Sequence, residues 1–196
     1  ASWTPVAIKL PTLSKTGHTC KWYENSSGTG TAYDSGGSYT PSATSPASIT
    51  MYAKCTANTY TVSYTLNGGT KGSGAPTTGA TYDTVYNITA TKTVTITGNA
   101  NNTGATVGNP TSKAQTFAGW TSSSSAGLDT TNAKTGTTNN PTTTWSGSST
   151  KNTYFKNLRS TSGTVTMTAN WTAAAVTLPT VTKTRYTGTW YETPSG

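Results

Sequence analysis

Residues 10–28 read LPTLSKTGHTCKWYENSSG, and this stretch returns near the other end of the chain as LPTVTKTRYTGTWYETPSG, residues 178–196. Eleven of the nineteen positions are identical, at a constant offset of 168 residues. A second phrase also occurs twice, as ITMYAKCTA at residues 49–57 and as VTMTANWTA at residues 165–173. The two phrases together predict a chain built from repeated units, the last of them incomplete.

The order of the two phrases predicts where each unit begins and ends. We expect a first, atypical unit at residues 1–57, a second unit at residues 58–173, and the start of a third, incomplete unit at residues 174–196, a possible docking strand. A weaker copy of the first phrase, NPTSKAQTFAGW, lies within the second unit at residues 109–120. The polar stretch at residues 122–150, mostly Ser, Thr, Gly and Asn, is predicted to be a long insertion in that unit.

Side chains that alternate between apolar and polar predict strands in much of the chain. The alternation is clear at residues 60–66, 91–97 and 164–171. Asn67-Gly68-Gly69 suits a tight reversal, because glycine adopts positive φ without a steric penalty. No stretch has the period of an amphipathic helix. We therefore expect a mainly β fold with long polar loops and little or no helix.

Several of these motifs occur together in one known family. The chain resembles the internalin B-type B-repeat, or Listeria/Bacteroides repeat, of bacterial surface proteins, in four segments: residues 60–69, Pro110-Thr111, residues 116–120 and residues 165–171. The resemblance implies tandem, small, β-grasp-like modules at the cell surface, and it brings no catalytic residues. The first and third copies depart from it, since they lack the residue that corresponds to Gly119.

The two cysteines occupy positions that are aromatic in the second unit. Cys20 stands where that unit has Phe117, and Cys55 stands where it has Trp171. If the two positions face each other, Cys20 and Cys55 can form a disulfide in place of an aromatic pair. A disulfide would place the protein outside the reducing cytosol, at the cell surface or in the extracellular space. Two buried free thiols are the alternative.

The composition does not favour catalysis or metal binding. Only 9% of the residues are charged, and the chain has five acidic residues and a single histidine, His18. These groups are scattered, so no acid–base pair or set of metal ligands is predicted. His18 aligns with Tyr186 and is expected to replace a half-buried ring. We expect no enzyme activity, no cofactor and no bound metal.

The net charge of +8 at pH 7 does not predict nucleic-acid binding. Nucleic-acid modules gather their basic residues on one face, whereas the thirteen Lys and Arg of this chain are spread singly along it. Weak attraction to anionic cell-wall polymers remains reasonable. The chain contains no apolar run long enough to cross a membrane.

These features predict a non-enzymatic structural protein outside the cell. It is either a stalk segment of a surface adhesin or a subunit of a head-to-tail filament, in which strand exchange with another copy completes the third unit. Its partners would then be further copies of itself or neighbouring repeats. A simpler alternative is that the third segment folds back on its own chain. The candidate assembly residues are Leu178, Pro179, Tyr186, Trp190 and Tyr191.

A carbohydrate- or receptor-binding module is the alternative function. Trp3 and Trp145 lie outside the repeated phrases, so we take them as candidate stacking platforms for a host or cell-wall glycan. The other tryptophans belong to repeated phrases and are expected to pack in cores: Trp22, Trp120, Trp171 and Trp190.

Overall fold

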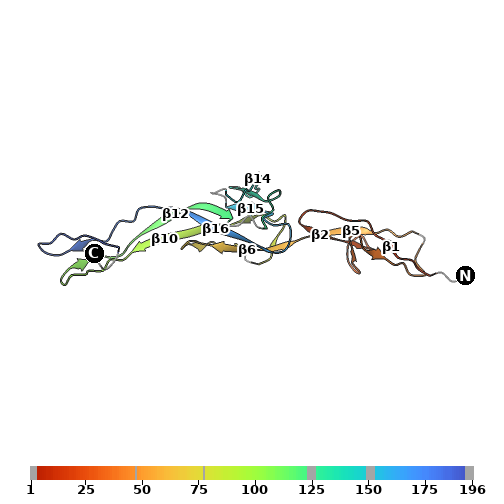
Figure 1. Ribbon diagram of the computed structural model, residues 1–196, viewed down its shortest axis with the longest axis horizontal. Coiled ribbons are helices and arrows are strands. Elements are labelled where there is room, and N and C mark those ends of the chain that lie inside the picture. Colours follow the sequence, from red (N-terminus) through yellow and green to blue (C-terminus); the bar gives the residue numbers. More distant parts are fainter. Residues whose placement is uncertain (1–3, 47, 77, 123–126, 149–152, 193–196) are drawn as a thin grey trace.

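The computed structural model describes residues 4–46, 48–76, 78–122, 127–148 and 153–192. The chain forms an elongated series of β units, with the N-terminal unit at one end and the C-terminal segment at the other (Figure 1). None of the described residues is helical. The fold is therefore mainly β, with several small sheets and one curled, six-stranded half-barrel.

The N-terminal unit is a small set of antiparallel strands. Its strands are β1 (Ile8–Lys9), β2 (His18–Tyr23), β3 (Tyr33–Asp34), β4 (Ser38–Tyr39) and β5 (Tyr52–Ala57). Strand β2 lies between β3 and β5, while β1 pairs with β4 as a separate ribbon. Both β2 and β5 come from repeated phrases, so the repeats supply the longest pair of strands in this unit.

The central unit is the six-stranded half-barrel, with the strand order β7-β10-β12-β16-β6-β8. Strands β6 and β16 pair in parallel, and every other neighbouring pair in this sheet is antiparallel. Its strands are β6 (Thr59–Thr65), β7 (Thr70–Lys71), β8 (Ala80–Thr81), β10 (Ala90–Ile96), β12 (Thr111–Ser122) and β16 (Thr164–Thr172).

Two smaller sheets complete the described chain. One has the order β14-β13-β15-β9. In the other, β11 pairs with β17. Their strands are β9 (Tyr86–Asn87), β11 (Thr106–Val107), β13 (Lys134–Gly136), β14 (Thr143–Thr144), β15 (Tyr154–Lys156) and β17 (Val181–Thr182).

The hydrophobic core lies in the central unit and follows the alternation of its strands. In β16, every second side chain is buried, at Val165, Met167 and Ala169. The insertion predicted at residues 122–150 also contributes to this core, through residues that include Leu128, Ala133 and Trp145. Ordering of that polar stretch is therefore explained by tertiary contacts, because its few apolar residues are buried.

Candidate functional site

The disulfide that joins β2 to β5 lies at the position predicted from the repeats. Cys20 and Cys55 are directly paired in the antiparallel register and are bonded through their sulfurs. In the central unit, Phe117 and Trp171 are paired in the same way between β12 and β16, with ring centroids 5.5 Å apart. One unit therefore fastens this strand pair covalently, and the other fastens it with two aromatic rings.

The first and third copies of the long phrase also share a tertiary hydrogen bond. The indole of Trp22 donates from Nε1 to the carbonyl oxygen of Pro11 over 2.8 Å. Trp190, 168 residues later, donates in the same way to the carbonyl oxygen of Pro179, also over 2.8 Å. The phrase therefore makes the same indole contact in both copies.

A tight turn within the phrase is repeated as well. It occupies residues 15–18 in the first copy and 183–186 in the third, and each turn is closed by a backbone hydrogen bond of 3.0 Å. Its third residue has positive φ in both copies, 69° at Gly17 and 65° at Arg185. A residue other than glycine can occupy this position, but it bears a backbone strain there.

In the first copy, this turn forms the joint with the central unit. Only Asn58 separates the end of β5 from the start of β6. Its backbone N–H donates to the carbonyl oxygen of Gly17 over 2.8 Å, and its carbonyl oxygen accepts from the backbone N–H of Tyr82 over 2.9 Å. The ring of Tyr82 packs directly against Gly17, so that a Cβ at residue 17 would overlap with it.

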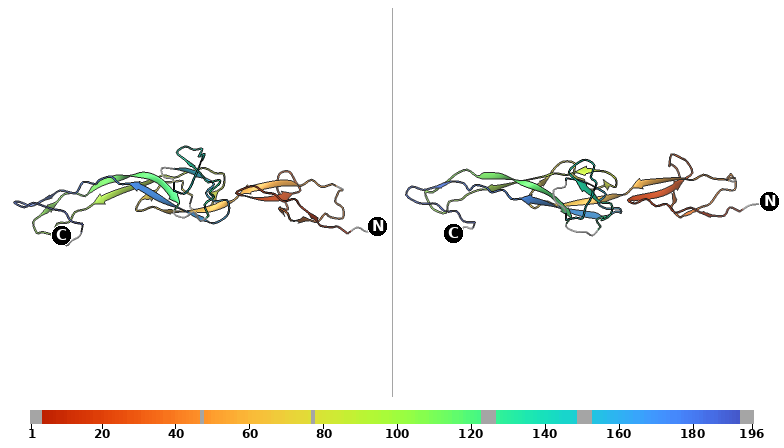
Figure 2. Two further views of the ribbon diagram at one scale, coloured as in Figure 1. Left: turned by 45° about the horizontal axis from the view of Figure 1, so that its top comes forward. Right: turned by 90° about the horizontal axis from the view of Figure 1, so that it is seen from above.

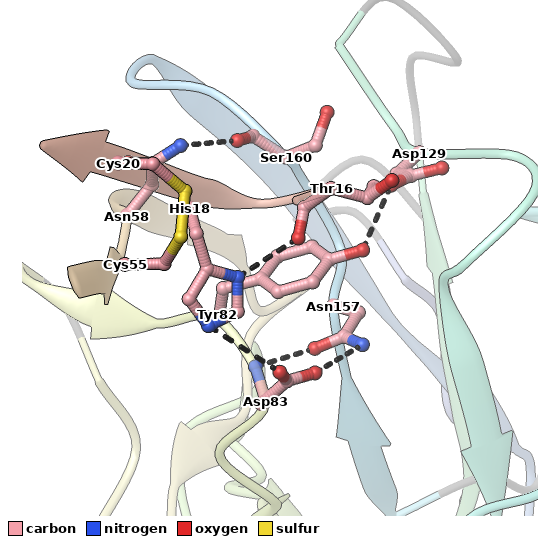
Figure 3. A network of polar contacts seen from close by, with 10 residues as sticks. All are labelled: Thr16, His18, Cys20, Cys55, Asn58, Tyr82, Asp83, Asp129, Asn157 and Ser160. Atoms are coloured by element: carbon pink, nitrogen blue, oxygen red, sulfur yellow. Dashed lines mark hydrogen bonds and ion pairs between the residues drawn. A yellow bond between two sulfur atoms is a disulfide. The ribbon is translucent and has the colours of Figure 1, made fainter. Parts of the chain in front are cut away.

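The side chain of Asn58 is used at the joint too (Figure 3). Its amide nitrogen donates to the carbonyl oxygen of Ser160 over 2.8 Å, as Figure 3 shows. Its amide oxygen accepts from the hydroxyl of Thr19 over 2.6 Å. Every polar group of this one connecting residue therefore has a partner. We regard the connection as a fixed joint, since a flexible linker would leave these groups to water.

His18 lies on the other side of the same joint and contacts an acidic residue of the central unit. Its Nε2 is 3.7 Å from Oδ2 of Asp83, and its side chain is almost fully buried. Asp83 is held in turn by Asn157, which accepts from the backbone N–H of Asp83 over 2.6 Å and donates to its Oδ1 over 3.0 Å (Figure 3). Both Asp83 and Asn157 have positive φ, which these two residue types tolerate better than most.

Tyr82 connects the joint to the segment that precedes β13. Its hydroxyl donates to Oδ2 of Asp129 over 3.2 Å. Burial of the ring, together with the negative charge of Asp129, raises the pKa of Tyr82 above its ordinary value. The phenol therefore remains a neutral hydrogen-bond donor at physiological pH.

The carboxylates at the joint are engaged in structural contacts. Besides Tyr82, Asp129 accepts hydrogen bonds from the backbone N–H groups of Thr131 and Asn132 and from the side chain of Asn132. Within the described residues, no group of three or more His, Cys, Asp or Glu side chains could hold a metal ion. The arrangement suits a rigid connection between units.

The C-terminal segment lies against the far end of the central unit. Strand β17 pairs with β11, and the backbone N–H of Ala174 donates to Oε1 of Gln115 over 2.7 Å. Trp190 packs closely on Gly98. The described part of the candidate assembly segment is therefore folded back on its own chain, while Tyr186 and Tyr191 remain largely exposed.

The leucine that opens the phrase is buried in the first copy and half exposed in the third, whereas the proline after it is exposed in the first copy (Pro11) and buried in the third (Pro179). Leu10 is only 7% exposed, and its backbone N–H donates to the carbonyl oxygen of Gly37 beside β4. The equivalent Leu178 is 49% exposed.

The proposed stacking role of Trp145 is wrong. Its side chain is 1% exposed and belongs to the core, because the insertion folds inward at this point. A sugar cannot stack on a ring that solvent does not reach. Trp3, the other candidate, lies outside the described residues.

The joint itself was not predicted from the sequence. Asn58, Tyr82 and Asp83 belong to no recognisable motif, and their partners Asn157 and Ser160 are distant in the chain. The one available signal was the absence of any loop between the closing phrase at residues 49–57 and the strand that begins at Thr59.

No helix in the described residues could span a bilayer. No protein-family model, curated protein or solved structure matches the chain.

Proposed function

We propose that this chain is a non-enzymatic structural element of an extracellular or cell-surface protein, a stalk segment whose units are joined end to end. The observation that carries the proposal is the one-residue connection at Asn58, whose backbone and side chain are fully engaged. A protein that must hold a fixed distance needs such joints, because free linkers collapse into coils.

The architecture supports the same function. The N-terminal unit, the central half-barrel and the C-terminal segment follow one another along the long axis (Figure 1). The N-terminal unit and the central half-barrel each have their own strand pairs and fastening contacts, as expected for serial modules, while β17 of the C-terminal segment pairs with β11. The disulfide is compatible with an extracellular location.

We also propose that the chain belongs to the B-repeat family. The parallel pairing of β6 and β16 inside an otherwise antiparallel sheet supports a β-grasp-like module, in which the first and last strands lie side by side. A polar insertion then takes up the middle of the module. In this proposal the chain acts as a spacer within an adhesin, a protein that attaches a cell to another surface.

A filament subunit is the second candidate, and the exposure of Leu178 favours it. In the N-terminal unit, β3 and β5 flank β2 of the same phrase, so the third copy, with Leu178 half exposed, offers a surface that a strand of another copy can cover. Because the phrase lies at one end of an elongated molecule, such contacts would propagate into a filament.

Sedimentation velocity combined with negative-stain electron microscopy tests both candidates. A stalk segment is expected to sediment as a monomer with a high frictional ratio and to appear as short rods. A filament subunit is expected to form long, regular fibres that the substitution Leu178→Lys abolishes. Compact, rounded monomers would contradict both.

A further inference from the structure

Two strands of the central unit lie between the joint and the C-terminal segment. Strand β6 is the first element after Asn58, and β16 is the last strand of the half-barrel before the C-terminal segment. The two run side by side along the long axis of the molecule in all three views (Figures 1 and 2). Pulling on the ends of the chain therefore loads β6 at its beginning and β16 at its end.

The direction of these strands decides how the load is shared. They are parallel, with Thr61 opposite Thr164 and Thr65 opposite Thr168. The start of β6 and the end of β16 are thus at opposite ends of the pair. Tension makes the strands slide past one another, and all the cross-strand hydrogen bonds must fail together. If both strands were pulled from the same end, the bonds would break one at a time.

We propose that the β6–β16 pair is a shear clamp that allows the chain to bear tensile load, for example between a cell surface and an attached object. This inference rests on the proposed stalk function and adds a mechanical activity to it. It assigns that activity to a specific strand pair.

Contacts beyond the ladder fasten the same two strands. The hydroxyls of Ser63 and Thr166 share a hydrogen bond of 2.7 Å across the pair. The backbone N–H of Thr61 donates to the carbonyl oxygen of Gly163 over 2.8 Å. These bonds add resistance in the direction in which the strands would slide.

The turn after β6 is also tied to the end of β16. The side chain of Asn67 donates to the carbonyl oxygen of Ala169 over 2.9 Å, and the indole of Trp171 donates to the carbonyl oxygen of Leu66 over 3.0 Å. The Asn67 amide and the Trp171 indole therefore extend the clamp past the last paired residue of β6.

One face of the clamp is protected from water. Val62, Val165 and Met167 are each 1% exposed and lie in the core. Water that attacks a stretched hydrogen bond must therefore approach from the other face. Sliding the strands would also pull these apolar side chains away from their core neighbours. The loss of those buried contacts opposes the same motion.

The N-terminal unit lies in series with the clamp and is protected in another way. The bond between Cys20 and Cys55 carries the load directly from β2 to β5. The residues between the two cysteines cannot be drawn out while it is intact. The shortest strand pairs on the path are then β1–β4 near its start and β11–β17 near its end, and both are expected to open first at low force.

Single-molecule force spectroscopy on the intact, oxidised chain tests the clamp with two pulling geometries. Handles at the two ends of the chain load β6 and β16 in shear. Handles at residues 59 and 164, attached through unnatural amino acids, load the same two strands from one end. We expect the rupture force of the central unit to be several-fold higher in shear. Equal forces in the two geometries would overturn the clamp.

A pair of matched substitutions gives a second test that leaves the fold intact. Ser63→Ala removes the cross-strand hydroxyl contact inside the clamp and should lower the shear rupture force. Ser112→Ala removes an equivalent contact, the 2.8 Å hydrogen bond between Thr95 and Ser112 across β10 and β12, outside the clamp. The second variant should rupture at the same force as the unmodified chain. Equal losses in both would also overturn the assignment.

The shape of the particle, measured separately, distinguishes failure of the clamp from failure of the stalk. An elongated monomer with equal forces in the two geometries leaves the stalk proposal standing and removes the clamp. A compact particle removes the stalk and the load-bearing role together.

Discussion

The ring of Tyr82 lies against the backbone of Gly17, where the N-terminal unit meets the central half-barrel. Gly17 has a φ of 69°, and the absence of a side chain lets the aromatic ring close the joint. At the equivalent position of the third copy, Arg185 has nearly the same φ. The contact with Tyr82, more than the turn itself, therefore requires glycine at residue 17.

The substitution Gly17→Ala is expected to loosen this joint. A Cβ at this φ costs about 1–3 kcal/mol, and overlap with the Tyr82 ring adds to that cost. Chemical denaturation followed by tryptophan fluorescence measures the loss. The matched control is Arg185→Ala, which should change stability by less than about 0.5 kcal/mol because its residue already has a Cβ. Equal effects would show that the ring contact does not matter.

Loss of the disulfide should destabilise the N-terminal unit. For a separation of 35 residues, the chain-entropy model predicts a loss of about 4 kcal/mol on replacing both cysteines with serine. The double substitution Cys20→Phe with Cys55→Trp recreates the aromatic pair of the central unit and should recover part of the loss, about 1 kcal/mol. An aromatic variant no more stable than the serine variant would contradict the equivalence of the two strand pairs.

Reduction should also lengthen the chain under tension. With the disulfide intact, the residues between Cys20 and Cys55 cannot extend. Reduction should add about 12 nm to the contour length released when the N-terminal unit opens, from about 3.4 Å per residue over the 35-residue separation. Pulling traces with and without a reducing agent measure this difference. Identical lengths would mean that the disulfide does not lie on the load path.

Stability should fall at alkaline pH because several tyrosines ionise less readily in the folded chain. Burial raises the pKa of Tyr60 and Tyr64 above the ordinary value. The hydrogen bond from Tyr33 to Glu24 raises the pKa of Tyr33 to about 12. Unfolding therefore releases protons from these tyrosines above about pH 10. Their contribution to the free energy of unfolding is complete below that pH and is lost as pH rises toward the folded-state pKa values.

Absorbance of tyrosinate near 295 nm, followed in native and denatured protein, measures these shifts. In the native chain, part of the signal should appear only at a pH above that of the denatured chain, and the melting temperature should fall over the same range. If the two titrations coincide, the tyrosines are not held as described.

Trp145 should matter for stability and not for sugar binding. Replacing this buried ring with alanine leaves a large cavity and is expected to cost about 3–5 kcal/mol. The exposed Tyr191 offers the control, since Tyr191→Ala should change stability by less than about 0.5 kcal/mol. A stable Trp145→Ala variant that has lost binding to a glycan would reverse this assignment.

The repeats predicted which positions of the two units correspond, and the structure adds that these positions face each other across paired strands. The match of Cys20 to Phe117 and of Cys55 to Trp171 predicted a disulfide only on the condition that the two positions face each other, because an alignment of copies does not specify which strands pair. The role of Trp145 could not be found in this way, because an insertion has no second copy to compare. Neither could the joint, since the contacts of Asn58 with Ser160 and of Asp83 with Asn157 join positions far apart in the chain.

Small-angle X-ray scattering of the oxidised monomer tests the central claim most directly. A compact chain of this length has a radius of gyration of about 16 Å. An end-to-end series of units with a fixed joint predicts a clearly larger value, together with the distance distribution of a folded rod and the thin cross-section of a single β unit. A radius near that of the compact chain would contradict the account, as would the featureless scattering of a flexible coil.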